Sequence, residues 1–297
     1  MTRAGFVSII GLPNSGKSTL VNALSEGKIS IVSPKPQTTR QRVFSIVNKD
    51  SLQIIFSDTP GWILDAKYPL HKLMNDKISE SLSDADLIVI LVDGQKGIQE
   101  FIQIHELTSK IDHLPKLIVI NKIDLLIQTQ QEQLLAEIQK MISDIPVFLI
   151  SAKTAHGVPE LMSNIENKIP EHPFYFPDDI ISDKPIRFFI SELIREQIFF
   201  QYQDEIPYSV FVEIYSCKGV DEGLEMAKIE AIIHVSKESQ VSIMLGKGGS
   251  KIKALGISAR KEIESYLGQK VYLGLTVKIK KDWRNNQAFI EKSGILR

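Results

Sequence analysis

The chain has 297 residues, of which 43% are hydrophobic, and this length is sufficient for two compact domains with separate cores. No apolar run reaches the roughly 18 residues that a membrane span requires, and the N-terminus carries no signal-peptide pattern, so we expect a cytoplasmic protein. Cys217 is the single cysteine, which excludes an internal disulfide and argues against a cysteine-based metal site.

The formal net charge of −1 hides an asymmetry along the chain. Residues 241–297 carry 12 Lys and Arg against 4 Asp and Glu, a net charge of +8, whereas the remaining chain carries 23 against 32, a net charge of −9. A basic segment of this kind is typical of a surface that binds a polyanion, although it can also be no more than a solvated face.

The first motif lies between a β-type run over residues 6–10 and a helix expected from residue 19. Residues 11–18 read Gly-Leu-Pro-Asn-Ser-Gly-Lys-Ser and fit the pattern G-x-x-x-x-G-K-[ST] in its strand, loop and helix context. Lys17 is expected to reach the β- and γ-phosphates of a nucleotide, and Ser18 to hold Mg²⁺. The predicted phosphate contacts are Gly11, Leu12, Pro13, Asn14, Ser15, Gly16, Lys17, Ser18 and Thr19.

A second group of candidate residues follows the first helix. The long polar loop over residues 28–42 contains Thr38 and Thr39, and long loops in compact domains are usually functional. Residue 58 then places a carboxylate just after a β-type run, followed by a glycine whose N–H can face a γ-phosphate. We therefore predict Asp58 on the metal side of the site, with further contacts from Thr59, Pro60, Gly61 and Trp62.

Strand and helix patterns alternate through the first part of the chain, which predicts an α/β domain with a mostly parallel sheet and a site at the carboxyl ends of the strands. The strands are expected over residues 43–47, 52–56, 87–92, 117–120 and 147–150, and the helices over 19–24, 69–82, 98–111, 130–142 and 158–168.

Two further motifs select guanine as the base. The Asp124 carboxylate can accept hydrogen bonds from N1–H and the 2-amino group of guanine, neither of which adenine offers, so an unpaired carboxylate penalises adenine. We expect Asn121 to brace the loops, the Lys122 stem to cover the base and the N–H of Ala152 to meet guanine O6. The predicted base contacts are Asn121, Lys122, Asp124, Ser151, Ala152 and Lys153.

A proline-rich segment without periodicity, residues 170–184, is expected to link the domain at 1–169 to a second domain at 185–297. Its expected elements are helices over 187–202 and 250–267, a short helix over 241–245, and strands over 208–215, 224–235 and 271–279.

Residues 246–249 of the second domain read Gly-Lys-Gly-Gly. The pattern G-x-x-G has little meaning alone, but here it joins a short helix to a longer one within the basic segment. This context resembles the G-x-x-G loop of a KH domain, and the resemblance implies RNA contacts from Gly246, Lys247, Gly248, Gly249, Lys251 and Lys253. Trp283 could touch RNA or pack in the core, and we expect the core.

These motifs together resemble a known family. The first 170 residues are similar to Ras-like, translation-factor-class GTPases, and the strings Gln37-Thr38-Thr39-Arg40 and Asp58-Thr59-Pro60-Gly61-Trp62 more narrowly resemble the Era-type ribosome-assembly GTPases. The order of elements around the G-x-x-G loop resembles a KH type II domain. The resemblance implies a Ras-like P-loop GTPase domain followed by an α+β KH domain.

The resemblance also implies an activity. It predicts a GTP-hydrolysing switch protein that binds GTP, GDP and Mg²⁺ and acts in 30S ribosomal subunit assembly through the 3′ end of 16S rRNA. It makes Thr39 the expected switch residue, with Thr38 the alternative, and gives the metal ligands as Ser18, Thr39 and Asp58. The catalytic candidates are Lys17, Thr39, Gly61 and Asn14.

Two details of the site depart from Ras-type proteins. Trp62 stands where they carry the water-orienting glutamine, so we expect slow intrinsic hydrolysis. GTPases with asparagine at the position of Asn14 often resemble potassium-activated ones, but this side chain could also merely shape the loop.

Two other functions remain open from the sequence. The protein could be a nucleotide-gated RNA-binding scaffold with incidental hydrolysis, or a tRNA-directed or membrane-signalling GTPase. The family is also associated with the inner face of the membrane, which would here be a peripheral contact through basic surface. We expect a monomer.

Overall fold

A computed structural model describes residues 1–25, 27–33, 35–108, 111, 114–142, 144–220 and 225–292. The chain divides into two compact units, of which the first comprises Met1–Lys67 and His71–Asp183 and the second comprises Tyr68–Leu70 and the described residues from Lys184 onward. Each unit has a sheet and a hydrophobic core of its own.

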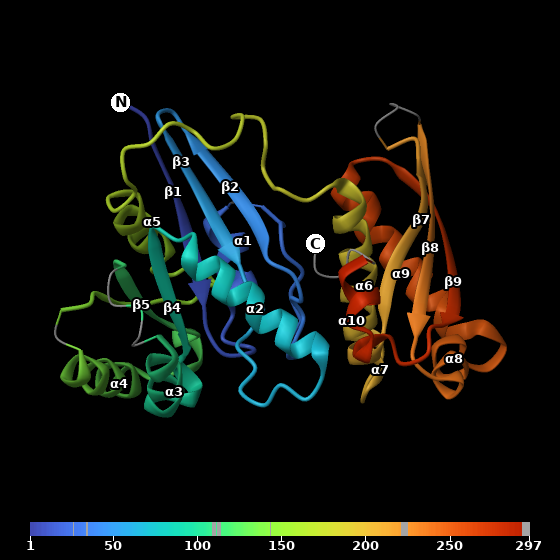
Figure 1. Ribbon diagram of the computed structural model, residues 1–297, viewed down its shortest axis with the longest axis horizontal. Coiled ribbons are helices and arrows are strands. Elements are labelled where there is room, and N and C mark those ends of the chain that lie inside the picture. Colours follow the sequence, from blue (N-terminus) through green and yellow to red (C-terminus); the bar gives the residue numbers. More distant parts are fainter. Residues whose placement is uncertain are drawn as a thin grey trace. The chain divides into compact units, whose positions relative to one another are not determined.

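Six strands form one sheet in the described part of the first unit, in the order β2-β3-β1-β4-β5-β6 (Figure 1). β2 runs antiparallel to β3, and the other neighbouring pairs are parallel. The parallel arrangement brings the carboxyl ends of β1, β3, β4 and β5 to one edge, which is where ligands bind in α/β sheets. The strands are β1 Arg3–Ile10, β2 Val43–Lys49, β3 Leu52–Asp58, β4 Leu87–Asp93, β5 Lys116–Asn121 and β6 Val147–Leu149.

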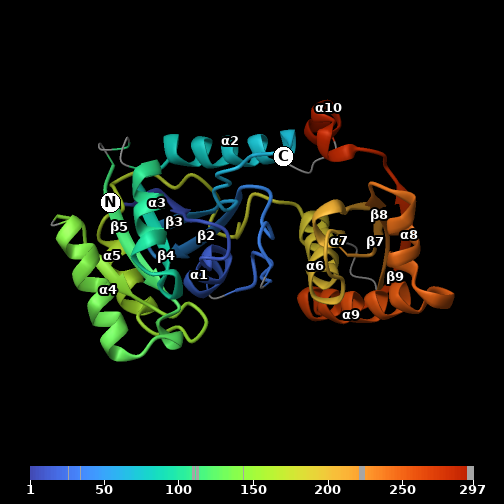
Figure 2. The ribbon, with the colours of Figure 1, turned by 90° about the horizontal axis from the view of Figure 1, so that it is seen from below.

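Helices cover both faces of this sheet (Figure 2). Leucine, valine and isoleucine side chains of α1 and α5 pack in one core cluster, and those of α2, α3 and α4 pack in another on the opposite face. All seven residues of β4 are buried, as expected for a central parallel strand covered on both sides. The helices are α1 Lys17–Leu24, α2 Pro69–Ser83, α3 Ile98–Thr108, α4 Gln128–Met141 and α5 Val158–Glu166.

The segment expected as a linker lies against the first unit. We call residues 170–183 the strap, because they run beside the edge strand β2: Ile46 N donates to Ile181 O at 2.9 Å, and Phe44 N donates to the Asp183 carboxylate at 2.8 Å. The strap therefore occupies hydrogen-bonding groups that an edge strand otherwise exposes.

The buried Gln53 side chain in β3 holds the middle of the strap. Its Oε1 accepts from Tyr175 N at 2.8 Å and Phe176 N at 3.0 Å, and its Nε2 donates to Phe176 O at 2.8 Å and Asn48 Oδ1 at 2.9 Å. The Gln53 side chain thus makes hydrogen bonds to the strap backbone of the kind that a neighbouring β-strand would otherwise make.

The second unit packs helices against one face of a three-stranded sheet formed by its described residues, in the order β7-β8-β9. β8 and β9 pair in parallel over ten residues each, and β7 is antiparallel to β8. Side chains of α6 and α9 form the core with β8. The elements are α6 Ile186–Gln201, α7 Ile206–Ser209, β7 Phe211–Lys218, β8 Met226–Val235, α8 Glu238–Leu245, α9 Ser250–Leu267, β9 Lys270–Ile279 and α10 Gln287–Lys292.

Several element boundaries differ from the sequence expectation. The strand expected from residue 208 begins at Phe211, because Pro207 sits in the first turn of α7, where its fixed φ suits a helix. Residue 224, and residues 109 and 110 at the end of the helix expected over 98–111, lie outside the described residues. Trp283 is fully buried and donates Nε1–H to Ser209 O at 2.9 Å, which confirms its core position.

In the portion of the chain for which the structure gives a conformation, no helix combines the length and apolar character needed to cross a membrane.

Candidate nucleotide site and nucleic-acid surface

The glycines of the phosphate loop sit where a side chain has no room. A Cβ on Gly11 would lie 2.6 Å from Leu91 O, and a Cβ on Gly16 would lie 2.3 Å from Asn121 Nδ2. Gly16 also has a φ of 98°, a conformation that L-residues rarely adopt. The loop therefore packs against β4 and β5 closely, and α1 begins directly after it with its N–H groups facing the pocket.

Lys17 points back over the loop that carries it. Its Nζ donates to Gly11 O at 3.2 Å and to Leu12 O at 3.0 Å. Burial lowers the pKa of Lys17 to about 8, against the opposing influence of Asp58 and Glu100, which favour the charged form. A cation held at the mouth of an N–H-lined loop is suited to a polyphosphate.

Asp58 ends β3 with two buried carboxylate oxygens that have no hydrogen-bond partner among the described residues. Burial raises the pKa of Asp58, and the nearby hydroxyls of Ser30, Ser18 and Thr39 and the Lys17 ammonium oppose that shift. An unpaired buried carboxylate is costly, and a cation satisfies it. The residues present therefore fit Mg²⁺, a cation that prefers oxygen ligands.

The two threonines of the loop after α1 have different surroundings. The Thr39 Oγ1 lies 2.8 Å from Ser18 Oγ, and both residues line the pocket beside the phosphate loop. The Thr38 Oγ1 is instead 2.8 Å from Lys35 O and 2.8 Å from Ser33 Oγ, within its own loop. The geometry therefore favours Thr39 over Thr38 as the hydroxyl beside Ser18 and Asp58.

In the segment over residues 59–62, Gly61 lines the pocket beside the phosphate loop. Thr59 Oγ1 donates to Ile9 O at 2.8 Å, so its hydroxyl fastens this segment, including Pro60, to β1. A Cβ on Gly61 would lie 2.7 Å from the backbone N of Pro13, which brings the two motifs into contact. The Trp62 side chain packs on the apolar cluster under α2, and the backbone N–H of Trp62 donates to Gly11 O at 3.2 Å.

Asn121 braces three parts of the site, as expected. Its Nδ2 donates to Ser15 O at 2.9 Å, and its Oδ1 accepts from Ala152 N at 2.9 Å. The second contact corrects one expectation: the N–H of Ala152 is engaged by Asn121 and does not face an open base position. The physical reason is burial: Asn121 is 2% exposed as a residue, so its side-chain oxygen Oδ1 needs a hydrogen-bond donor within the protein.

Asp124 and Lys153 are exposed at the base end, while Ser151 is buried and its Oγ accepts from Thr154 N at 3.2 Å. Asp124 is exposed, unlike the buried carboxylate that the argument for guanine assumed, because it lies in the short surface turn Ile123–Leu125. Lys122 is partly buried, with a φ of 64°, which turns its stem back along the site.

An acidic group beneath the site was missed by sequence reasoning. Lys122 Nζ lies 2.6 Å from Asp93 Oδ2, and Asp93 N donates to the buried Glu100 at 3.1 Å. Lys96 Nζ lies 2.8 Å from Glu100 and also donates to Pro13 O at 3.4 Å. The available signal was the position of Asp93 at the end of β4, on the same edge as Asp58 and Asn121.

Asn14 is exposed at the tip of the phosphate loop with a φ of 67°, a conformation that asparagine tolerates better than most residues. It lines the pocket together with Thr38 and Thr39. Both expectations for Asn14, loop shaping and a cation contact, are compatible with this position.

In the second unit, the loop Gly246–Gly249 joins α8 to α9 and has positive φ at three glycines. Gly246 has a φ of 69°, Gly248 of 60° and Gly249 of 78°. A Cβ on Gly246 would lie 2.7 Å from the Lys251 stem, whereas Gly248 faces open space. Lys247 is exposed, so the loop presents one cation and no other bulk.

A groove of about 460 Å³ lies between α9 and β9, beside that loop. Ile252 and Leu275 contribute apolar surface, Tyr272 a half-exposed ring, and Lys253 and Arg260 positive charge. Aromatic and apolar surface for bases next to cations for phosphates is the combination that single-stranded nucleic acid requires.

Family models match both units. Residues 6–122 match the model described as 50S ribosome-binding GTPase, and residues 205–284 match the model described as KH domain. GTPase Era of Geotalea uraniireducens (strain Rf4) is 43% identical over 293 residues, covering 98% of this chain and 97% of that protein. The chloroplastic GTPase ERA-like protein of Oryza sativa subsp. japonica is 40% identical over 294 residues, covering 98% of this chain and 69% of that protein.

Two solved structures superpose on the whole chain. The crystal structure of Era in complex with MgGDPNP and nucleotides 1506–1542 of 16S ribosomal RNA has a TM-score of 0.94 and 36% identity, covering 100% of both chains. A variant of Aquifex aeolicus Era bound to GDP·AlF4⁻ has a TM-score of 0.93 and 36% identity, again covering 100% of both chains.

Proposed function

Since the chain belongs to the Era family of GTPases, we propose that it is a GTP-driven switch protein that binds 16S rRNA near the 3′ end and acts in 30S subunit assembly. One observation carries this proposal: a single chain contains both a guanine-nucleotide pocket braced by Asn121 and a G-x-x-G loop beside a basic, apolar groove. Either feature alone fits many proteins, whereas the pair defines a nucleotide-controlled RNA binder.

We assign the nucleotide site to the domain at 1–169 and the RNA surface to the domain at 185–297. The linker at 170–184, which is the strap together with Lys184, joins the two domains. In this assignment the predicted phosphate, base and metal contacts act as the sequence suggests, except that the N–H of Ala152 bonds Asn121, and Ser18, Thr39 and Asp58 are the ligands of Mg²⁺. The ion supplies positive charge that neutralises the phosphates. Support comes from the two unpaired oxygens of Asp58 beside the Ser18 and Thr39 hydroxyls.

Hydrolysis in this assignment is slow and depends on positioning. Lys17 stabilises charge on the phosphates, and the N–H of Gly61 and the Thr39 backbone position the γ-phosphate and water. Trp62 takes no part in holding water, since its indole packs on the apolar cluster under α2. Asn14 contributes by holding K⁺ beside the phosphates, where positive charge offsets the charge that develops during hydrolysis.

RNA binding is assigned to the loop Gly246–Gly249, the first turn of α9 and the groove. Lys247 and the open Gly248 allow close approach of a backbone, Lys251 and Lys253 add charge along α9, and Tyr272 offers a ring for a base. The protein is proposed to be a cytoplasmic monomer that also reaches the inner membrane face peripherally, through its basic surface.

The test separates the two surfaces. Changing Lys247→Asp together with Gly248→Asp replaces one positive charge by two negative charges at the closest point of approach. Binding of an oligonucleotide of the 16S rRNA 3′ end should be lost, while GTP titration on the same preparation is unchanged. A matched control, Lys278→Asp with Thr276→Asp, places two acidic side chains on the exposed part of β9 instead.

Three results would contradict the proposal. Retained RNA affinity in the loop variant at moderate salt would mean that diffuse charge alone binds RNA. Recovery of tRNA rather than 30S subunits, when GTP- and GDP-loaded protein are compared as bait, would favour a tRNA-directed GTPase. An equal hydrolysis rate with and without RNA, together with nucleotide-dependent RNA affinity, would favour a scaffold with incidental hydrolysis.

A further inference from the structure

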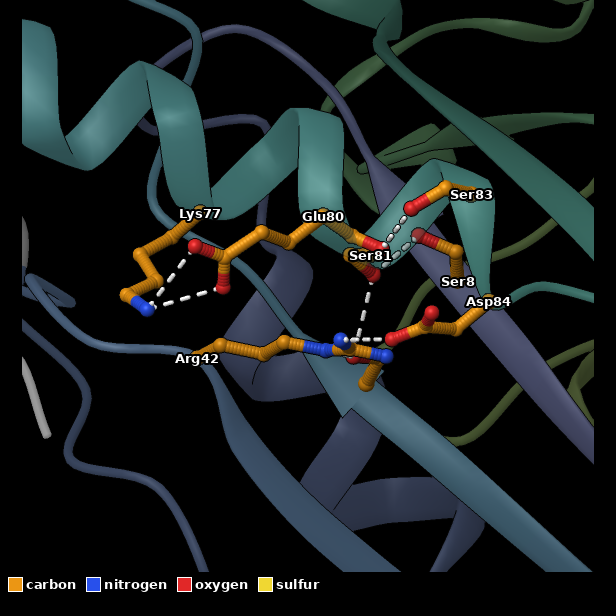
Figure 3. Close-up of polar contacts among 8 residues, drawn as sticks. Ser8, Arg42, Lys77, Glu80, Ser81, Ser83 and Asp84 are labelled. Atoms are coloured by element: carbon orange, nitrogen blue, oxygen red, sulfur yellow. Dashed lines mark hydrogen bonds and ion pairs between the residues drawn. The ribbon is translucent and has the colours of Figure 1, made fainter.

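A chain of side-chain hydrogen bonds lies beneath the loops that surround the phosphate site (Figure 3). Arg42, the residue before β2, donates Nε–H to Ser57 Oγ at 2.6 Å and Nη1–H to Asp84 Oδ2 at 2.6 Å. Ser81 of α2 donates to the same Ser57 oxygen at 3.0 Å, and Ser8 of β1 lies 2.6 Å from Ser81. We call Ser8, Arg42, Ser57, Ser81 and Asp84 the arginine–serine chain.

The direction of these hydrogen bonds is fixed by chemistry. A guanidinium only donates, so the Ser57 oxygen must accept from Arg42. Ser81 donates its proton to Ser57, which leaves its oxygen to accept from Ser8. Removal of one of these hydroxyls leaves its neighbours unsatisfied and out of reach of bulk water, since all three serines are fully buried.

The arginine–serine chain joins the ends of the segments that must respond to a γ-phosphate. Arg42 lies three residues after Thr39, at the end of the loop over 28–42. Ser57 directly precedes Asp58, and Ser81 and Asp84 lie at the end of the helix that follows Gly61. One side chain thus fastens the exit of the first loop both to the strand that carries Asp58 and to α2.

The Arg42 side chain is itself held firmly. It is 10% exposed, and its guanidinium lies 4.6 Å from the centroid of the Phe44 ring. This cation–π arrangement helps to orient the guanidinium plane. The contrast is the pair Lys77 and Glu80 on the same helix, which is 2.8 Å apart but exposed and connects nothing outside α2 (Figure 3). Surface pairs of that kind contribute little.

We infer that Arg42 is a positioning residue that couples the loop of Thr39 to Asp58 and α2, so that the affinity for GTP, but not the affinity for GDP, depends on this coupling. The inference rests on the proposed roles of Thr39 and Asp58. A nucleotide with a γ-phosphate needs both loops arranged together, and its apparent affinity falls with the fraction of protein in that arrangement. GDP makes no γ-phosphate contact, so its affinity does not depend on the coupling.

The experiment measures dissociation constants for GDP and for a non-hydrolysable GTP analogue, both with Mg²⁺. Arg42→Met keeps the aliphatic stem over Phe44 but removes every donor. We expect the analogue to bind about tenfold more weakly and GDP to change less than about twofold. Arg42→Lys, which can reach Ser57 or Asp84 but not both, should fall between, and Lys77→Met is the matched control without effect.

Two partner variants keep the test decisive if Arg42→Met does not fold. Ser57→Ala removes the hydroxyl and Asp84→Ala removes the carboxylate that accept from Arg42, and each should show the same selective loss in smaller degree. Equal weakening of GDP and the analogue, or no change in either, overturns the inference. Thr39→Ala separates this failure from failure of the proposed site. If Thr39→Ala also leaves the ratio of the two dissociation constants unchanged, the assignment of Thr39 is wrong as well.

Discussion

Replacement of Gln53 by leucine should release the strap from the first unit. The amide of Gln53 makes four hydrogen bonds, three of them to backbone groups of Tyr175 and Phe176 and one to Asn48. Leucine has nearly the same volume and no polar atoms, so the change removes these bonds without opening a large cavity. The sheet itself should stay intact, because the Gln53 backbone is unchanged.

The size of the effect follows from the groups left behind. Each backbone donor or acceptor that stays buried without a partner costs about 1–3 kcal/mol, and three such groups face the leucine. The strap is partly exposed, so these groups can regain water if it lifts, and that movement limits the total loss. We therefore expect the free energy of unfolding of the first unit to fall by about 2–4 kcal/mol, less than the full sum of the three penalties.

Hydrogen exchange of the full-length protein, followed by mass spectrometry of peptides, measures the loss of stability segment by segment. Peptides covering residues 171–183 should lose protection first and most, and peptides covering β2 and β3 should follow, while β8 and β9 report the second unit separately. Gln128→Leu, which removes an exposed glutamine from α4, is the control and should change stability by less than about 0.5 kcal/mol. Unchanged protection of residues 171–183 in Gln53→Leu would refute the reasoning.

Three further outcomes are expected. Asp124→Asn should weaken GTP binding and favour xanthine nucleotides, whose C2 oxygen accepts where guanine donates; unchanged GTP affinity in titrations would remove Asp124 from the site. Nucleotide binding at pH 8.5 should take up about 0.7 proton, because the phosphates raise the pKa of Lys17 from about 8, and calorimetry in buffers of different ionisation enthalpy checks this. Without nucleotide, the unfolded chain binds more protons at Lys17 between about pH 8 and 10.5, so this residue makes stability rise with pH there. GTP hydrolysis should be faster in potassium than in sodium buffer, and Asn14→Ala should remove the difference; equal rates in the two salts would leave Asn14 with loop shaping only.

The motifs that predict the nucleotide site are local in the sequence. Gly16, Lys17 and Ser18 are neighbours in the chain, and their geometry depends on one turn between a strand and a helix. The parallel sheet followed from alternating patterns, and Trp283 followed from the tendency of large aromatic side chains to be buried.

The contacts that sequence reasoning missed join residues far apart in the chain. Gln53 and Phe176 are 123 positions apart, and Ser8 and Ser81 are 73 apart. A proline-rich segment without periodicity reads as a linker, and single serines carry no pattern, since their partners are set by how the layers pack. The Ala152 N–H was expected to contact the base but bonds Asn121 instead, and the cause is the same: Asn121 lies 31 residues away in the sequence.

The parallel pairing of β8 with β9 has a consequence for synthesis of the protein. The loop Gly246–Gly249 and α9 lie entirely within the connection between these two strands, so the groove acquires its second wall only when β9, which ends at Ile279, joins the sheet. Parallel strands joined by a long crossover form late, because the crossover must be ordered before the pairing stabilises it. A ribosome therefore completes the first unit while the nascent chain still lacks the groove between α9 and β9, and the proposed capture of RNA begins only after residue 279 has emerged.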